Sequence, residues 1–222
     1  MCIFDAFKFH MKQLKNKLFV LFIIVISSAY SQYGSVELNT GGFSLVPAFT
    51  DDQPNFIINL GTSTDKRVSG NLIANIRVDG MIQRGGIFIT RYKLIDKKLK
   101  LHLGAHLPAF QVDEDFHMDT FFAREVLATY QLSESVGFTG MFIRGTGMNN
   151  DFKMKLLNFL AIIRKNSFVF TTQVYGMDFE NTYGVAQAVS YTISKKFSIN
   201  GFLNKTLSDG SVISTFGLRY QM

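Results

Sequence analysis

The chain has 222 residues, one cysteine, no tryptophan and a formal net charge of +6. Cys2 lies upstream of the cleavage site predicted below, so the mature chain would have no thiol for a disulfide, a thiolate metal site or a cysteine nucleophile. Cleavage would remove four of the 23 basic and one of the 17 acidic residues, which leaves a net charge of +3. Such a small charge argues against a nucleic-acid-binding protein.

An export signal opens the chain. Lys12, Lys15 and Lys17 follow Met11, residues 18–26 are all apolar, and Ala29-Tyr30-Ser31 carries small residues at the positions that a signal peptidase reads. The apolar run is too short to span a bilayer, which takes about 20 residues. We therefore predict a signal peptide over 1–31, cleaved between Ser31 and Gln32, and one mature domain over 32–222. An uncleaved N-terminal anchor is the alternative, and Met11 is a second candidate for the true start.

Turn signals divide the rest of the chain into segments of about ten residues, the length of a tilted transmembrane β-strand. The predicted turns are 50–53, 62–67, 79–81, 95–97, 108–119, 133–135, 148–151, 164–166, 178–181, 194–196 and 208–210. They predict about twelve strands, with 10–12 possible, of which the first begins near Gly42. An even number would place both termini on the periplasmic side.

The segment from Lys98 to Leu107 shows the alternation of these strands most clearly. Its leucines and Ala105 fall on one face, and its lysines, histidines and Gly104 fall on the other. A period of two is typical of a β-strand with one apolar and one polar face.

Charge separates between the two predicted ends of the barrel. The periplasmic turns carry Lys66, Arg67, Lys97, Arg164, Lys165, Lys195 and Lys196, whereas the outer loops carry Asp51, Asp52, Asp113, Glu114, Asp115, Asp119, Asp151, Asp178, Glu180 and Asp209. Turns of random composition would mix the signs, so the separation supports the strand count.

The last segment, Val212 to Met222, is amphipathic and ends Phe-Gly-Leu-Arg-Tyr-Gln-Met. This ending resembles the C-terminal signal of small Gram-negative outer-membrane β-barrel proteins of the porin-like class, although Tyr220 stands in place of a terminal phenylalanine. The resemblance implies an all-β fold: a single antiparallel up-and-down transmembrane barrel. It also implies assembly by the barrel-assembly machinery, contact with outer-membrane lipid and lipopolysaccharide, and possible envelope protein partners.

Alternation alone does not tell which face meets lipid. A soluble lipocalin-like barrel would bury the leucines and expose the lysines. About twelve strands would enclose more space than side chains readily fill, because roughly eight already suffice, so we expect the apolar face outside. Arg124 then shares the lipid face with Val126, which is tolerable only near the membrane interface.

The predicted lumen is polar and modestly cationic. Its candidate solute-contacting residues are Arg77, Arg91, Lys93, Lys98, Lys100, His102, His106, Glu125 and Arg219. A cationic wall would favour anionic solutes. The alternative is a lumen closed by internal salt bridges, such as Glu125 with His102 or Lys100.

The sequence predicts no cofactor and no catalytic constellation. Asp113, Glu114, Asp115 and Asp119 could supply oxygen ligands to Ca²⁺, but they lack the spacing of a known calcium loop. We consider three functions: a passive small-solute channel, a non-catalytic structural or accessory barrel of an envelope or secretion machine, and a lipid-modifying hydrolase. The hydrolase is the weakest, because no Gly-x-Ser-x-Gly motif occurs.

Overall fold

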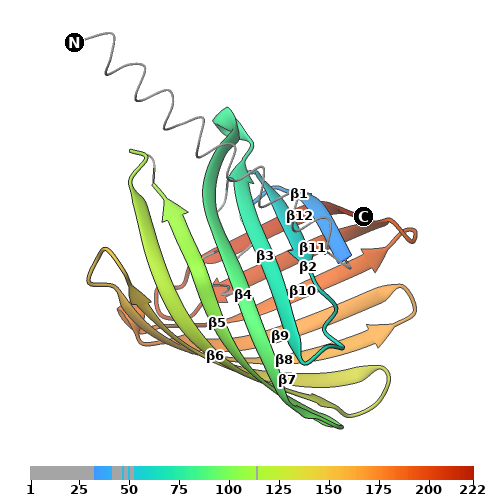
Figure 1. The fold of residues 1–222 in the computed structure, drawn as a ribbon. Coiled ribbons are helices and arrows are strands. Elements are labelled where there is room, and N and C mark those ends of the chain that lie inside the picture. Colours follow the sequence, from blue (N-terminus) through green and yellow to red (C-terminus); the bar gives the residue numbers. More distant parts are fainter. Residues whose placement is uncertain (1–32, 42–46, 48–49, 51–52, 114) are drawn as a thin grey trace, which may run out of the picture.

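The computed structural model describes residues 33–41, 47, 50, 53–113 and 115–222. Twelve antiparallel strands form a closed barrel in which each strand pairs with its neighbours along the chain and β1 pairs with β12 (Figure 1). The strands are β1 (Tyr33–Asn39), β2 (Asn55–Gly61), β3 (Val68–Arg77), β4 (Ile82–Asp96), β5 (Leu99–Val112), β6 (Met118–Gln131), β7 (Val136–Gly147), β8 (Lys153–Lys165), β9 (Phe168–Met177), β10 (Thr182–Thr192), β11 (Phe197–Thr206) and β12 (Val212–Gln221). The predicted all-β up-and-down barrel is confirmed.

Two boundaries differ from the prediction. The first strand begins at Tyr33 and not near Gly42, and β5 and β6 extend through most of the predicted 108–119 loop to leave only 113–117 between them. The predicted signal segment, 1–31, lies outside the described residues. Within the part that is described, no helix is long and apolar enough to cross a membrane.

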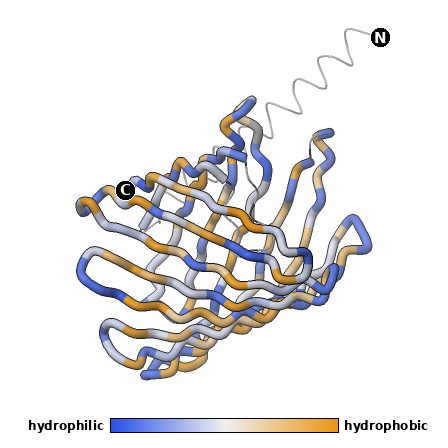
Figure 2. The backbone as a smooth tube through the Cα atoms, turned by 180° about the vertical axis from the view of Figure 1, so that it is seen from behind, coloured by the Kyte–Doolittle hydropathy of each residue, from blue (hydrophilic) through white to orange (hydrophobic). Residues whose placement is uncertain are grey.

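Hydrophobic and hydrophilic residues alternate along the strands of the barrel (Figure 2). Leu103, Phe142, Val174, Leu203 and Phe216 are all 41–65% exposed on the outside. Large apolar side chains that face outward all around a closed barrel are suited to lipid and not to water. The lipocalin-like alternative is therefore wrong.

The turns place opposite charges at the two ends of the barrel. Lys97, Lys165 and Lys195 lie at the end that carries both chain termini of the barrel, and Asp113, Asp151, Asp178 and Asp209 lie at the other end. In the β11–β12 turn the Ser211 backbone N–H donates to the Asp209 carboxylate at 2.9 Å and lowers its pKa, while Gly210 supplies a φ of +78°. We call the end with the chain termini the periplasmic end and the other the outer end.

Candidate functional site

The candidate site is the barrel lumen, and strand register defines which side chains enter it. Residues directly opposite each other in neighbouring strands share a face. Arg91 on β4 is directly opposite Gly104 on β5, which is opposite Glu125 on β6. Glu125 is in turn opposite Ile143 on β7. Glu125 is 2% exposed and Ile143 is 2% exposed, so this row faces the interior.

Glu125 is the centre of a buried ion-pair network. Arg91 donates from Nε and a terminal nitrogen to the two Glu125 oxygens at 2.6 and 3.0 Å, and His106 Nε2 lies 3.0 Å from Oε2. Gly104 stands between Arg91 and Glu125 without a side chain, which leaves room for the two to meet across β5. The predicted partners of Glu125, His102 and Lys100, are therefore wrong, although the prediction of an internal salt bridge is confirmed.

A second ion-pair group lies near the periplasmic end. Lys93 Nζ contacts an Asp96 carboxylate oxygen at 2.9 Å and donates to the backbone oxygen of Asp65 at 3.1 Å. Lys100 Nζ lies 3.9 Å from the other Asp96 oxygen and its side chain is 49% exposed. His102, directly opposite Lys93, has a buried Nδ1 for which the described residues provide no hydrogen-bond partner.

A third group spans the seam where the barrel closes. Glu37 on β1 is 4% exposed and accepts hydrogen bonds from Arg219 on β12 at 2.8 Å, Asn200 on β11 at 2.8 Å and Asn39 at 2.6 Å. Sequence reasoning missed Glu37, because the first strand was predicted to begin after it. Its signal was the alternation of Val36 and Leu38 around it.

The structure places two of the predicted lumen residues, Arg77 and Lys98, on different sides of the barrel wall. Arg77 lies on the inward face of β3, opposite Asn55. Lys98 does not face the lumen: it lies in the turn before β5, and its Nζ stands 5.4 Å from the centre of the Tyr130 ring, which is on the barrel exterior. That any of these residues contacts a solute stays a prediction.

Much of the lumen wall is apolar, which the sequence did not predict. One cluster on β6–β9 consists of Ala123, Met141, Ile143, Met154, Leu156, Tyr175 and Met177. A smaller cluster on β2–β4 consists of Ile57, Ile73 and Ile89. The signal was present in β8, where Leu156-Leu157-Asn158-Phe159-Leu160 is apolar on both faces except at Asn158. The lumen therefore has polar and apolar sectors.

Tyr175 connects the apolar sector to β11, two strands away. Its hydroxyl donates to Asn204 Oδ1 at 3.0 Å, and Asn204 donates from Nδ2 to the backbone oxygen of Pro47 at 3.3 Å. Pro47 lies between β1 and β2 in sequence and is fully buried. Pro47 of the β1–β2 connection therefore lies inside the barrel.

Gly184 on β10 has no side chain, which leaves the space that the Tyr175 side chain crosses to reach Asn204 on β11. A Cβ at Gly184 would lie 2.6 Å from the backbone oxygen of Lys205 and 2.5 Å from the Tyr175 hydroxyl. We expect Gly184→Val to lower the free energy of unfolding by about 1–3 kcal/mol, because overpacking displaces backbone. Urea unfolding followed on unheated gels would measure it. Gly176→Val is the control, since its nearest neighbour is 4.0 Å away; equal losses in both variants would contradict this interpretation.

A cavity of about 570 Å³ occupies the outer half of the lumen. Its wall includes Ile73, His106 and Ile143 from the strands and Phe152 and Phe179 from outer loops. The Phe152 ring lies 5.2 Å from that of Phe121 and 4.9 Å from that of Phe179, which gives this mouth an aromatic rim. An incoming solute would meet both apolar and polar groups here.

The described residues of the acidic outer loop do not assemble a metal site. Among the described residues, no group of three or more His, Cys, Asp or Glu side chains could hold a metal ion. Asp113 accepts a hydrogen bond from the His117 backbone N–H at 2.8 Å, which gives it a role in the turn. Asp115 lies in the same loop, Asp119 lies on β6, and Glu114 is outside the described residues.

The lumen histidines have no serine partner in the part of the chain that the structure describes. His106 contacts Glu125, and His102 faces Lys93 across the β4–β5 pair. A hydrolytic serine needs a base within hydrogen-bond reach, and this arrangement does not provide one.

The barrel is similar to solved outer-membrane porins. The KdgM porin in complex with disordered oligogalacturonate superposes with a TM-score of 0.64 at 6% identity, over 85% of this chain and 98% of that one. The KdgM porin gives 0.60 at 6% identity over 85% and 97%, and the NanC porin gives 0.56 at 9% identity over 85% and 97%. No protein-family model and no curated protein matches the chain by sequence. The likeness is therefore one of fold, and the fold is that of porin-like outer-membrane barrels.

Proposed function

We propose that the protein is a passive channel for small solutes in a bacterial outer membrane, without enzymatic activity. The observation that carries this proposal is the 570 Å³ cavity inside a closed twelve-strand barrel whose exterior is apolar. A barrel of twelve strands encloses more space than its side chains readily fill, because about eight strands already make a lumen that side chains can fill.

We further propose that the lumen favours anions only weakly. Basic side chains in the lumen outnumber acidic ones. The basic residues are Arg77, Arg84, Arg91, Lys93, Lys100 and Arg219, and the acidic residues are Glu37, Asp96, Asp119 and Glu125. Most of these cations already have a carboxylate partner, at 2.6 Å for Arg91, 2.7 Å for Arg219 and 2.9 Å for Lys93. Lys100 is the most available, with a partner at 3.9 Å and a half-exposed side chain.

A closed accessory barrel is the second candidate. The hydrogen bond between Asn204 and Pro47 places chain inside the lumen, and the inner apolar cluster on β6–β9 is 0–8% exposed. Both features narrow the interior. Such a barrel would be silent in a bilayer and would co-purify with envelope partners.

Planar-bilayer recording distinguishes the two candidates. We expect discrete conductance steps. In a KCl gradient we also expect a small reversal potential whose sign shows that Cl⁻ permeates more readily than K⁺. Lys100→Gln should lower the anion-to-cation permeability ratio by roughly fivefold at most, since a unit charge several ångströms away in water stabilises an anion and destabilises a cation by about 0.5 kcal/mol each.

Lys98→Gln is the matched control, because Lys98 is a neighbouring lysine that contacts Tyr130 on the exterior. It should leave the permeability ratio unchanged. Equal shifts in both variants would contradict the assignment of Lys100 to the lumen. Absence of any conductance from correctly folded barrel would favour the accessory function.

A further inference from the structure

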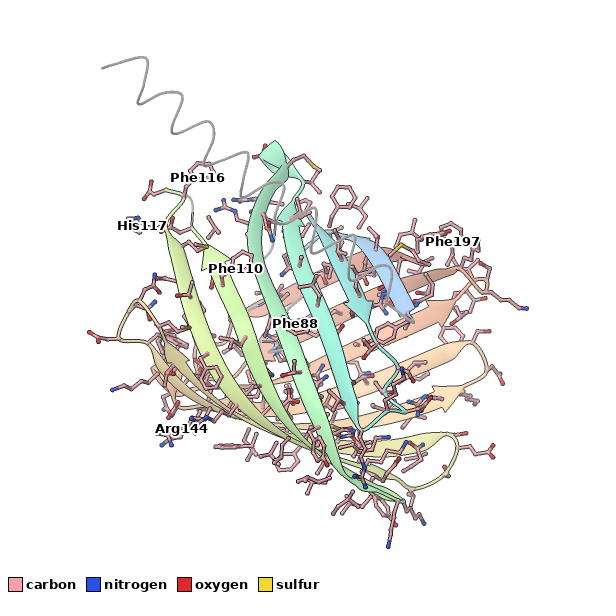
Figure 3. All side chains as sticks on the ribbon, viewed as in Figure 1. Phe88, Phe110, Phe116, His117, Arg144 and Phe197 are labelled. Atoms are coloured by element: carbon pink, nitrogen blue, oxygen red, sulfur yellow. The ribbon has the colours of Figure 1, made fainter. Side chains whose placement is uncertain are left out.

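Three cations lie side by side on the lipid-facing exterior near the outer end of the barrel. Arg124 on β6 is directly opposite Arg144 on β7, and Arg144 is directly opposite Lys155 on β8. All three side chains are exposed, and Figure 3 shows Arg144 on the outside of the barrel, pointing away from it. We call these three residues the cationic row.

The cationic row is unfavourable without a counter-ion. Like charges directly opposite each other in neighbouring strands repel, and cations on the lipid face become more costly with depth in the bilayer. Among the described residues, no carboxylate contacts Arg124 or Arg144; the Arg124 guanidinium instead lies 5.6 Å from the centre of the Phe122 ring. Lys155 is the one member with an acidic partner: its Nζ lies 3.9 Å from Asp178, whose carboxylate also accepts the Lys155 backbone N–H.

The row lies toward the outer end of β7 and β8, at a level where we expect lipid headgroups. Arg144 is close to the outer end of β7 at Gly147, and Lys155 is close to the start of β8 at Lys153. Near an interface the cost of an exposed cation falls to almost nothing. An anionic headgroup at this level could therefore approach all three side chains.

Apolar side chains occupy the lipid-facing surface directly below the row, toward the membrane centre. The next outward positions on the same strands are Val126, Phe142 and Leu157, again directly opposite one another, and they are 40%, 41% and 47% exposed. Phe159 follows and is 57% exposed. A ligand that fits this surface has an anionic head above and acyl chains below.

We infer that the cationic row binds the phosphate groups of lipopolysaccharide, through the lipid A headgroup, while its acyl chains lie on the apolar row formed by Val126, Phe142 and Leu157. This proposal rests on the outer-membrane placement proposed above, but not on conductance. Guanidinium groups bind phosphate oxygens through paired hydrogen bonds, and an ammonium group adds a point charge. Three adjacent cations match a headgroup that carries more than one phosphate better than a phospholipid with a single phosphate.

The test is lipid binding to the folded full barrel in detergent. We expect bisphosphorylated lipid A to raise the thermal unfolding midpoint and to remain bound in native mass spectrometry. The triple variant Arg124→Gln/Arg144→Gln/Lys155→Gln should bind it at least tenfold more weakly. The variant should still fold, since it removes like-charge repulsion, and the mobility of the unheated protein on a gel would verify this.

A second triple variant, Lys66→Gln/Lys97→Gln/Lys195→Gln, removes the same charge from the periplasmic turns and should bind lipid A like the wild type. Lys205→Gln removes a lone outward cation between Val185 and Val212 and should also have no effect.

Equal binding by the cationic-row variant and the wild type would overturn the proposal. So would equal stabilisation by dephosphorylated lipid A or by phosphatidylglycerol, which would point to general lipid contact. Because binding is measured without ion flow, a channel that fails to conduct can still pass this test.

Discussion

Glu125→Ala is expected to lower the free energy of unfolding of the barrel by about 3–5 kcal/mol, the usual cost of leaving one partner of a buried ion pair without the other. The Glu125 side chain is fully buried and Arg91 is 20% exposed, so water can restore only part of the lost interaction. His106, which is 3% exposed, loses its hydrogen-bond partner as well. Urea unfolding followed by the gel mobility of unheated samples is the appropriate measurement, since the chain has no tryptophan for fluorescence.

Two further variants separate the ion pair from the loss of volume. Arg91→Met/Glu125→Leu removes both charges and should recover most of the lost stability, because an apolar replacement of a buried pair is often neutral. Glu134→Ala, in an exposed periplasmic turn, should have no measurable effect. A double variant as unstable as Glu125→Ala would show that the network stabilises the barrel through something other than charge pairing.

Glu37→Ala is the second large effect we expect, again about 3–5 kcal/mol, and it should be localised at the barrel seam. Glu37 accepts hydrogen bonds from Arg219, Asn200 and Asn39, so its loss leaves three buried or half-buried donors without their acceptor. The β1–β12 pairing has only five residue pairs in register, the fewest of any strand pair in the described barrel. The seam should therefore open before the rest of the structure.

Hydrogen exchange resolved by peptide would test this localisation. In the Glu37→Ala variant, amides of β1 and β12 should exchange faster while those of β5–β8 keep their protection. Glu180→Ala, an exposed glutamate of an outer loop, is the control. Uniform loss of protection across all strands would contradict a seam held by Glu37.

The amphipathic pattern of the strands was accessible to sequence analysis because it is local. In β5 and β12 successive side chains point to opposite faces, so alternation reveals the strand without knowledge of its neighbours. The turns at 194–196 and 208–210 and the charge separation between the two ends were predictable for the same reason. The start of β1 was misplaced although Val36 and Leu38 alternate with polar neighbours over its seven residues, because the turn signals were followed only as far as 50–53.

The partners inside the lumen depend on register, which is a property of strand pairs. β4 and β5 shift register between Ile87 and Ile89 and again between Lys93 and Ile95. The bulge between Lys93 and Ile95 places Arg91 opposite Gly104 and so within reach of Glu125. Lys100 is opposite Thr129, four residues along β6 from Glu125, and does not reach it. The cationic row has the same origin: Arg124, Arg144 and Lys155 are distant in sequence and adjacent only across β6, β7 and β8.

The sequence by itself therefore determined the all-β fold class, the placement of basic and acidic turns at opposite ends of the barrel, and the apolar exterior. Periodicity and turn chemistry act over a few neighbouring residues, so these properties need no knowledge of the tertiary structure. Only the tertiary structure decided which charges neutralise each other, how apolar the lumen is and which cations gather outside. Those properties follow from the closure and register of twelve strands, which bring together side chains that the linear order keeps apart.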